Sequence, residues 1–260
     1  MTVPSSSVTC MIIEALLAFA IPLTAIIIWK VKSKASIVPA IGGALTFVLF
    51  AQMLEGSVHT LLLSSENPFS NLMSTNFFLY ALYGGLMAGI FEETGRYITM
   101  KFVLKNYNSK SDAVSYGLGH GGIECILVLG LNMLANIAFA VLVNSGAGES
   151  VLLPMAGGST ESLATIVSSL SEVTPALAAV AVFERVCAMA LQLCLSVMVF
   201  SAVKKNVLNY IWAAILVHAL ADFSILMVSQ YAGIYFAEAV LAVFVAAAAY
   251  YVFKVKKGEV

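Results

Sequence analysis

Charged residues are scarce in this sequence: Asp, Glu, Lys and Arg together make up only 10% of the 260 residues, whereas 61% are hydrophobic. The mean hydropathy of +0.97 is far above that of a water-soluble globular domain. Alternating ten-residue segments, which would indicate a transmembrane β-barrel, are also missing. The composition therefore predicts an integral membrane protein built from helices, in contact with the lipid bilayer, and no nucleic-acid partner is expected.

Cysteine is scarce as well, and no two cysteines form a CxxC pair. The four are Cys10, Cys125, Cys187 and Cys194. All lie in or near apolar segments, where cysteine acts as a small packing residue. The sequence therefore suggests neither a disulfide framework nor a cysteine-based zinc site.

Seven apolar runs are long enough to cross a hydrocarbon core of about 30 Å as α-helices. They cover residues 9–29, 36–63, 76–103, 113–143, 176–203, 207–229 and 233–253. The sequence thus predicts an all-α polytopic bundle of about seven transmembrane helices, forming a single integral membrane domain over residues 1–260. Since Met1 to Thr9 carry no charge, the first run is expected to be a retained helix rather than a signal peptide.

Lysine and arginine are absent from three of the connections, 64–75, 144–175 and 230–232. The lysines flank the other ends of the runs, at Lys30, Lys32, Lys34, Lys101, Lys105, Lys110, Lys204, Lys205, Lys254, Lys256 and Lys257. By the positive-inside rule, the N-terminus is outside and the C-terminus is cytoplasmic. In the outer connection 144–175, the sequence Ser159-Thr160-Glu161 before an apolar series predicts a short capped amphipathic helix.

Two adjacent glutamates and an arginine interrupt the third apolar run, in the sequence Glu92-Glu93-Thr94-Gly95-Arg96. Ionisable residues are expensive at membrane depth and usually face a bundle interior or an aqueous cavity. Adjacent side chains on a helix point about 100° apart, so the two glutamates cannot take the same role from the same direction. Arg96 is within one turn of both, and the spacing leaves open which of them it pairs with.

Two histidines are predicted to lie at a similar depth. At about 1.5 Å of rise per residue, Glu92 and Glu93 lie roughly 12 to 14 Å from the cytoplasmic boundary, His120 about 12 Å and His218 about 17 to 20 Å. The runs 76–103, 113–143 and 207–229 are therefore the expected active-site helices. Other polar residues are expected toward the outer side: Glu55, His59, Glu184 and Arg185.

Each of these histidines has a carboxylate one helical turn further on, Glu124 after His120 and Asp222 after His218. Such a carboxylate can orient an imidazole or share a metal ion with it. Peptide hydrolysis needs an activated water, a proton donor and an oxyanion stabiliser, and carboxylates with imidazoles can supply all three. His120, His218 and Glu92 are a candidate zinc set, although the helical HExxH signature is missing.

The order EExxR, His and then HxxxD resembles the CAAX-protease-like intramembrane peptidases, which include type II prenyl-protein proteases and PrsW-type proteases. The element from His120 to Glu124, His-Gly-Gly-Ile-Glu, looks most like the bacterial YhfC branch of intramembrane metalloproteases. The resemblance covers residues 92–222. It implies a multi-pass protein of the bacterial cytoplasmic membrane that cleaves a membrane-embedded or juxtamembrane protein or peptide near the cytoplasmic leaflet.

The resemblance also implies residue roles. One of Glu92 and Glu93 activates water together with His120, while His218 and Asp222 stabilise the oxyanion or complete a zinc site, with Arg96 as a counter-ion. Prenyl-protein proteases usually have EExxxR and HxxxN, whereas this chain has EExxR and HxxxD, closer to the PrsW-type pattern. Prenylated substrates are therefore not inferred, and water activation with or without metal stays open.

Two other functions fit the same polar residues. An ion- or proton-coupled transporter could use the Glu, His and Asp cluster to bind a cation or relay protons. The sequence has no evident inverted repeat, which disfavours this alternative. A catalytically inactive membrane scaffold is the other alternative. The sequence specifies neither the substrate nor the oligomeric state.

Four glycines lie within residues 117–122, just before and after His120. Glycine weakens a helix but permits the close approach of a neighbouring helix or of a substrate backbone. Tight helix packing and substrate access are equally compatible with this cluster.

Overall fold

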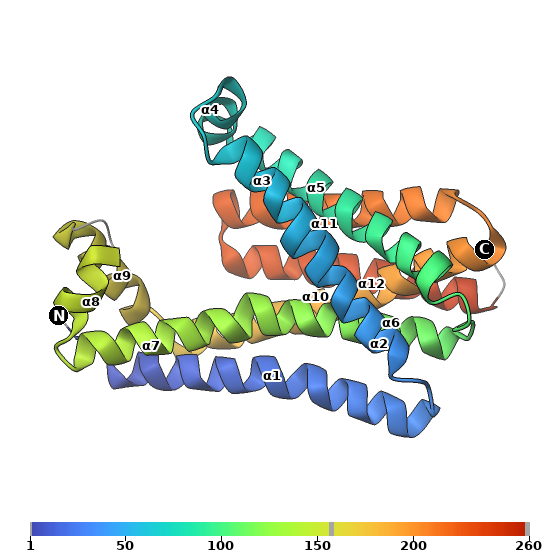
Figure 1. Ribbon diagram of the computed structural model, residues 1–260, viewed down its shortest axis with the longest axis horizontal. Coiled ribbons are helices and arrows are strands. Elements are labelled where there is room, and N and C mark those ends of the chain that lie inside the picture. Colours follow the sequence, from blue (N-terminus) through green and yellow to red (C-terminus); the bar gives the residue numbers. More distant parts are fainter. Residues whose placement is uncertain (1, 156–158, 258–260) are drawn as a thin grey trace. The chain divides into compact units, whose positions relative to one another are not determined.

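The computed structural model describes residues 2–155 and 159–257, and this part of the chain consists of helices without any strand (Figure 1). The N-terminal helices are α1 (Ser5–Ser33), α2 (Val38–Thr46), the π-helical segment η1 (Phe47–Glu55), α3 (Gly56–Leu63), α4 (Pro68–Thr75), α5 (Phe77–Ile98) and η2 (Thr99–Val103). The remaining helices are α6 (Lys110–Cys125), η3 (Ile126–Leu131), α7 (Asn132–Asn144), α8 (Gly148–Met155), α9 (Thr160–Ser171), α10 (Pro175–Lys205), α11 (Asn209–Ala232) and α12 (Ile234–Lys257). The predicted all-helical fold class is confirmed.

Six helical stretches are long and apolar enough to cross a membrane. They are Ser5–Ser33, Val38–Leu63, Lys110–Asn144, Pro175–Lys205, Asn209–Ala232 and Ile234–Lys254. Each coincides with one of the seven predicted runs. The remaining run, 76–103, is helical as α5 and η2, but Glu92 and Glu93 make it less apolar than the others. Its assignment as a seventh span stays a prediction.

The chain divides into two compact units. Unit 1 contains Met1–Ile21 and Cys125–Arg185, and unit 2 contains Pro22–Glu124 and Val186–Val260. Helices α1 and α10 contribute residues to both units, and α6 ends at their boundary. The sequence-based expectation of one membrane domain over the whole chain stays a prediction.

Unit 1 is held together by apolar side chains of α1, α7, α8 and α9, including Met11, Ala140 and Leu163. The N-terminus of α1 is fixed to the end of α7, because the backbone N–H of Val3 donates to Asn144 Oδ1 at 2.8 Å. Helix α9 begins as the sequence predicted. The side chain of Ser159 accepts a hydrogen bond from the backbone N–H of Ser162, which satisfies an otherwise unpaired donor.

In unit 2, the connections flanked by lysines lie at one end. Trp29 Nε1 donates to the backbone oxygen of Ser111 at 3.1 Å, and Ser115 Oγ donates to the backbone oxygen of Ser36 at 2.9 Å. Lys204 Nζ reaches Asn108 Oδ1 at 2.9 Å. These contacts bring three lysine-bearing connections together, which is the arrangement that the positive-inside topology requires. The orientation of this end toward the cytoplasm stays a prediction.

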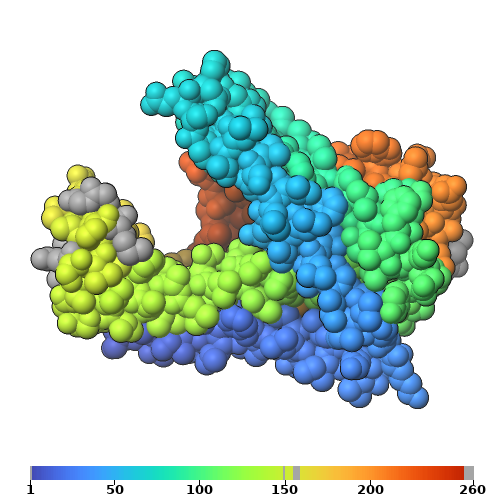
Figure 2. All heavy atoms as spheres, in the orientation of Figure 1, coloured from blue at the N-terminus to red at the C-terminus, as the bar shows by residue number. Residues whose placement is uncertain are grey.

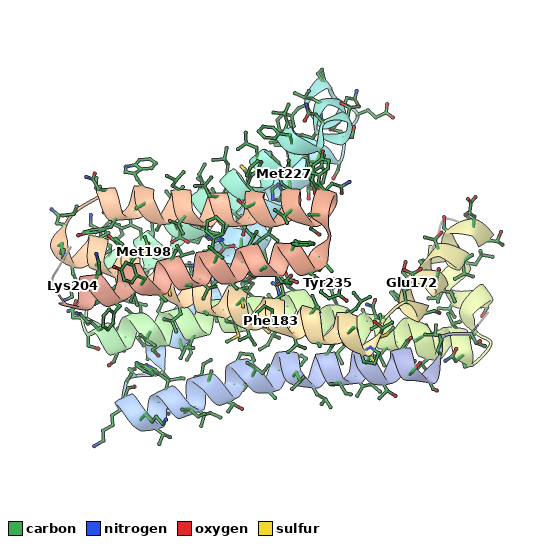
Figure 3. The ribbon with its side chains drawn as sticks, turned by 180° about the vertical axis from the view of Figure 1, so that it is seen from behind. Glu172, Phe183, Met198, Lys204, Met227 and Tyr235 are labelled. Atoms are coloured by element: carbon green, nitrogen blue, oxygen red, sulfur yellow. The ribbon has the colours of Figure 1, made fainter. Side chains whose placement is uncertain are left out.

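Glycines allow α5 to pack closely against α11. A Cβ atom at Gly85 would lie 2.4 Å from the backbone oxygen of Ala219, and one at Gly89 would lie 2.7 Å from that of Ile215. Gly85 and Gly89 are four residues apart, so they form a small-xxx-small face of the kind that packs membrane helices. Helix α11 in turn packs beside α12 (Figure 3). The close α5–α11 contact brings α11 beside the glutamates of α5.

The glycines around His120 serve the same purpose on α6. A Cβ at Gly119 would lie 1.9 Å from the backbone oxygen of Ala40 in α2, and one at Gly117 would lie 2.7 Å from the Cα of Leu193 in α10. In the space-filling view, the segment from α2 to α4 runs across the visible face, from blue to cyan (Figure 2). The packing supports the first of the two readings of this glycine cluster, tight contact between helices.

The π-helical segments lie next to the polar motifs. Segment η1 ends at Glu55, η2 begins three residues after Arg96, and η3 begins two residues after Glu124. Wider π turns within α-helices are frequent at functional sites, because they shift side chains out of regular helical positions. Their placement beside the polar motifs is typical of a functional site.

Candidate active site

Two carboxylate–imidazole pairs lie side by side in the interior of unit 2. Glu92 Oε2 is 2.8 Å from His120 Nε2, and Glu93 Oε1 is 2.8 Å from His218 Nδ1. All four side chains are buried; Glu93 and His120 have no exposed surface. The adjacent glutamates of α5 thus point to different neighbours, Glu92 to α6 and Glu93 to α11, as expected for successive residues of a helix.

His120 is further restrained by aromatic rings. The Phe47 ring meets it edge-on with centroids 5.3 Å apart, and the Tyr116 ring stacks on it with centroids 6.1 Å apart. Because its rotation is limited on both sides, His120 keeps Nε2 directed at Glu92. Its Nδ1 is buried and has no hydrogen-bond partner among the described residues.

Arg96 is the buried cation of this cluster. Its Nη1 lies 3.4 Å from Glu93 Oε2, so it pairs with Glu93 rather than with Glu92, which resolves the alternative left open by the spacing. The guanidinium also donates to Gln192, through Nη1 to the backbone oxygen at 3.2 Å and through Nη2 to the side-chain oxygen. A buried charge requires such compensation, because an unpaired one is strongly destabilising.

Gln192 connects the two sides of the cluster, and the sequence reasoning missed it. Its Nε2 donates to Glu92 Oε2 at 3.0 Å and to Glu124 Oε2 at 2.9 Å, while its Oε1 accepts from Arg96. The side chain therefore uses both of its amide hydrogens and its oxygen. Its signal in the sequence is that it is the one amide side chain within the apolar helix α10.

Glu124 and Asp222, the carboxylates predicted to follow the two histidines, occupy different positions. Asp222 Oδ2 lies 3.6 Å from His218 Nε2, and its side chain is 36% exposed. The ring of His218 is thus flanked by a carboxylate at each nitrogen, one buried and one exposed. Glu124 Oε2 accepts a hydrogen bond from Gln192 Nε2, so it joins the cluster through α10. Its expected role in orienting His120 stays a prediction.

The depth estimate was wrong for Glu55. This buried carboxylate is within electrostatic range of Glu92, His218 and Asp222. The segment α2–η1–α3 runs obliquely to α11 in Figure 1. Counting residues along this segment therefore overestimates how far Glu55 lies from the layer of Glu92 and His218. A π-helical path reinforces this error, because its residues do not follow the regular α-helical repeat.

Glu55 adds a third carboxylate–imidazole pair to the cluster. Glu55 Oε1 lies 3.1 Å from His59 Nε2, and His59 Nδ1 lies 2.8 Å from the hydroxyl of Tyr83. The side chain of His59 is 34% exposed. The chain Tyr83–His59–Glu55 thus links a partly exposed imidazole to the buried region. By contrast, Glu184 and Arg185 belong to unit 1 and pair with each other.

The candidate zinc ligands do not converge in this arrangement. His120 Nε2 is directed at Glu92, whereas His218 has Glu93 and Asp222 at its two nitrogens. Within the described residues, no group of three or more His, Cys, Asp or Glu side chains is arranged to hold a metal ion. Catalytic zinc usually takes three protein ligands, so the geometry described here does not fit such a site.

These features define a class: a multi-pass helical membrane protein with buried carboxylate and imidazole side chains in its interior. The chain belongs to the YhfC intramembrane metalloprotease family, whose profile matches residues 17–245. It is 35% identical over 259 residues to "Uncharacterized membrane protein YhfC" of Bacillus subtilis (strain 168), covering 98% of both chains. No solved structure matches it. The resemblance to the YhfC branch is therefore confirmed, and the wider CAAX-protease-like placement stays a prediction.

Proposed function

We propose that this protein is an intramembrane peptidase that hydrolyses a peptide bond of a membrane-embedded or juxtamembrane substrate. The observation that carries the proposal is the paired arrangement of Glu92 with His120 and of Glu93 with His218, buried among apolar helices. The family description supports it, since it names an intramembrane metalloprotease. Adjacent pairs of this kind can divide the work of hydrolysis between water activation and charge stabilisation.

Glu92 is the proposed general base. Glu93 is engaged by both Arg96 and His218, so its charge is already committed to an ion pair. Glu92 has no ion pair with Arg96; it is held by His120 and Gln192. Glu92 therefore accepts a proton from the attacking water and returns it to the nitrogen of the leaving amine as the C–N bond breaks, while the buried His120 orients the carboxylate.

His218 is the proposed donor to the oxyanion. Glu93 Oε1 is within hydrogen-bond distance of Nδ1, whereas Asp222 Oδ2 is 3.6 Å from Nε2, beyond hydrogen-bond distance. An imidazole with a proton on each nitrogen therefore donates to Glu93 through Nδ1 and keeps its Nε2–H for the oxyanion. Donors already oriented before the reaction stabilise a developing negative charge without reorganisation. Asp222 is the most exposed member of the set, which makes its side of His218 the proposed approach for the substrate carbonyl.

No step of this mechanism is routed through a metal, because the candidate ligands do not converge. Metal analysis of the purified protein tests this part separately. One zinc per chain that is lost in His120→Ala would establish a zinc site and require a different geometry from the one described. Full activity in the presence of a strong chelator supports the mechanism without metal.

The decisive test reconstitutes the purified protein in nanodiscs and identifies cleavage of a transmembrane-peptide library by mass spectrometry. Glu92→Gln is expected to lower the rate about 10²- to 10⁴-fold, the usual contribution of a general base. Glu161→Gln, an exposed carboxylate on α9, is the matched control and keeps the wild-type rate. Undiminished cleavage by Glu92→Gln rejects the proposal. Ion-dependent solute uptake into vesicles without any cleavage identifies a transporter instead.

A further inference from the structure

Unit 1 contains a buried carboxylate for which the described residues provide no ion-pair partner. Glu14, in the N-terminal half of α1, is only 3% exposed, and its Oε1 has no hydrogen-bond partner among the described residues. Carboxylates inside apolar helices normally pair with a cation or a hydrogen-bond donor. Glu93, by contrast, has both a cation, Arg96, and a hydrogen-bond partner, His218.

The cause lies in the composition of unit 1. Its two sequence segments contain five glutamates and a single basic residue, Arg185, with no lysine and no histidine. Arg185 is within contact distance of Glu184, the residue next to it. Unit 1 therefore has no cation of its own to offer Glu14.

Glu14 lines an open cavity of about 260 Å³ together with a second carboxylate, Glu172. Glu172 is the residue that ends α9, and Figure 3 labels it there. The hydroxyl of Ser169 also lines the cavity, and the rest of the wall is apolar, formed by Val173, Leu177 and Ala181. Two carboxylates and a hydroxyl beside an apolar wall match a ligand that has a charged head and a hydrocarbon stem.

The walls of this cavity are held in place before any ligand binds. Ser7 Oγ donates to the backbone oxygen of Ser171 at 3.0 Å, which ties α1 to the end of α9. Met11, one helical turn before Glu14, is fully buried in the unit 1 core. A preformed site loses less conformational entropy on binding than a flexible one.

We propose that this cavity binds a primary ammonium group attached to a short apolar chain, with Glu14 as the main acceptor and Glu172 as the second. A hard metal cation fits less well, because Ca²⁺ takes six to eight oxygen ligands and this cavity offers three oxygen-bearing side chains. A lysine side chain of a peptide and the ethanolamine head of a lipid share the required chemistry. The inference does not depend on the proposed peptidase activity.

The test measures thermal unfolding of the full-length protein in phosphatidylcholine nanodiscs with increasing n-butylammonium chloride. The unfolding temperature is expected to rise and to saturate, whereas n-butanol and sodium chloride at the same concentrations produce no saturable rise. Glu14→Gln is expected to raise the half-saturating concentration about tenfold or more, and Glu172→Gln to raise it less. Glu161→Gln, which removes an exposed carboxylate from the same unit, leaves the titration unchanged.

Two further arms separate the sources of the ammonium group. If a lipid supplies it, phosphatidylethanolamine in the nanodisc stabilises the wild type but not Glu14→Gln. If a peptide supplies it, a lysine-containing peptide competes with butylammonium and its N-acetyl-lysine analogue does not. Absence of a saturable ammonium effect, or an identical effect in Glu14→Gln, overturns the proposal. The two proposals can fail separately, because Glu14→Gln leaves Glu92 and His120 intact. If the wild type cleaves peptides but shows no saturable ammonium effect, only the ammonium site is rejected.

Discussion

The two units bury carboxylates in opposite ways. In unit 2, Glu92 and Glu93 meet two imidazoles, a guanidinium and an amide, all within hydrogen-bond or ion-pair distance. In unit 1, Glu14 lines a cavity, and its Oε1 has no hydrogen-bond partner among the described residues. The role of a polar residue in an apolar helix thus depends on its neighbours. Glu92 and Glu93 form an ordered network with their partners, whereas Glu14 lines the cavity for which we propose an ammonium ligand.

The largest effect is expected from removing the buried cation of unit 2. Arg96→Met removes the cation beside Glu93 and the donor to both oxygens of Gln192, and loss of one partner of a buried ion pair destabilises by about 3–5 kcal/mol. Denaturant unfolding in mixed micelles measures this loss. Glu14→Gln is the comparison in unit 1 and should leave stability nearly unchanged or raise it. Equal losses in both variants would contradict the contrast between the units.

A double variant sharpens this result. Arg96→Met combined with Glu93→Gln removes both charges, so it should be more stable than Arg96→Met alone. Additive losses from the two substitutions would mean that the Arg96–Glu93 contact at 3.4 Å contributes no coupling.

Gly84 and Gly85 are adjacent on α5 but differ in the space around them, so they provide a matched test of the α5–α11 packing. Gly85→Ala places a methyl group 2.4 Å from the backbone oxygen of Ala219, so the helices must separate, at a cost of about 1–3 kcal/mol. At Gly84, the nearest atom to such a methyl group is a side-chain carbon of Leu226 at 3.8 Å, an ordinary contact. Gly84→Ala should therefore be neutral or stabilising by up to about 1 kcal/mol. Unfolding and peptide cleavage of both variants check this.

Gln192→Leu tests how much the hydrogen bonds of Gln192 contribute to stability and to peptide cleavage. Gln192→Leu keeps a similar volume but leaves Glu92, Glu124 and Arg96 each without one partner. Loss of one partner of a buried polar group costs about 1–3 kcal/mol, so stability should fall within that range or somewhat beyond it. Cleavage should fall about tenfold or more, with most of the change in kcat if Gln192 positions Glu92. Loss of stability with an unchanged kcat would indicate a purely structural role.

The smallest effect is expected at Glu55, which contacts His59 and acts on the cluster through its field rather than by direct hydrogen bonds. Glu55→Gln should change the cleavage rate only a few-fold, since such longer-range interactions are weaker than a direct hydrogen bond. Glu66→Gln, an exposed carboxylate after the same helical segment, should have no effect. A loss at Glu55→Gln as large as that at Glu92→Gln would make Glu55 part of the reacting set.

Hydropathy was enough to predict the helical membrane class and the six candidate spans, and the sequence Ser159-Thr160-Glu161 predicted the capped helix α9. These features depend on local composition and on the regular rise of an α-helix, which a single sequence contains. The order of the motifs also predicted the family. The estimated depths predicted that Glu92, Glu93, His120 and His218 lie in a similar layer.

Only the tertiary structure determined which of the polar side chains are neighbours. Spacing along α5 allowed Arg96 to pair with either glutamate, and only the positions of α6, α10 and α11 around α5 assign it to Glu93. Gln192 and Glu55 join the cluster from other helices, one by close packing and the other because its helix runs obliquely. Likewise, the apolar sequence around Glu14 does not indicate a cavity. Helix tilt and the approach allowed by glycine are properties of pairs of helices, and no single segment of sequence contains them.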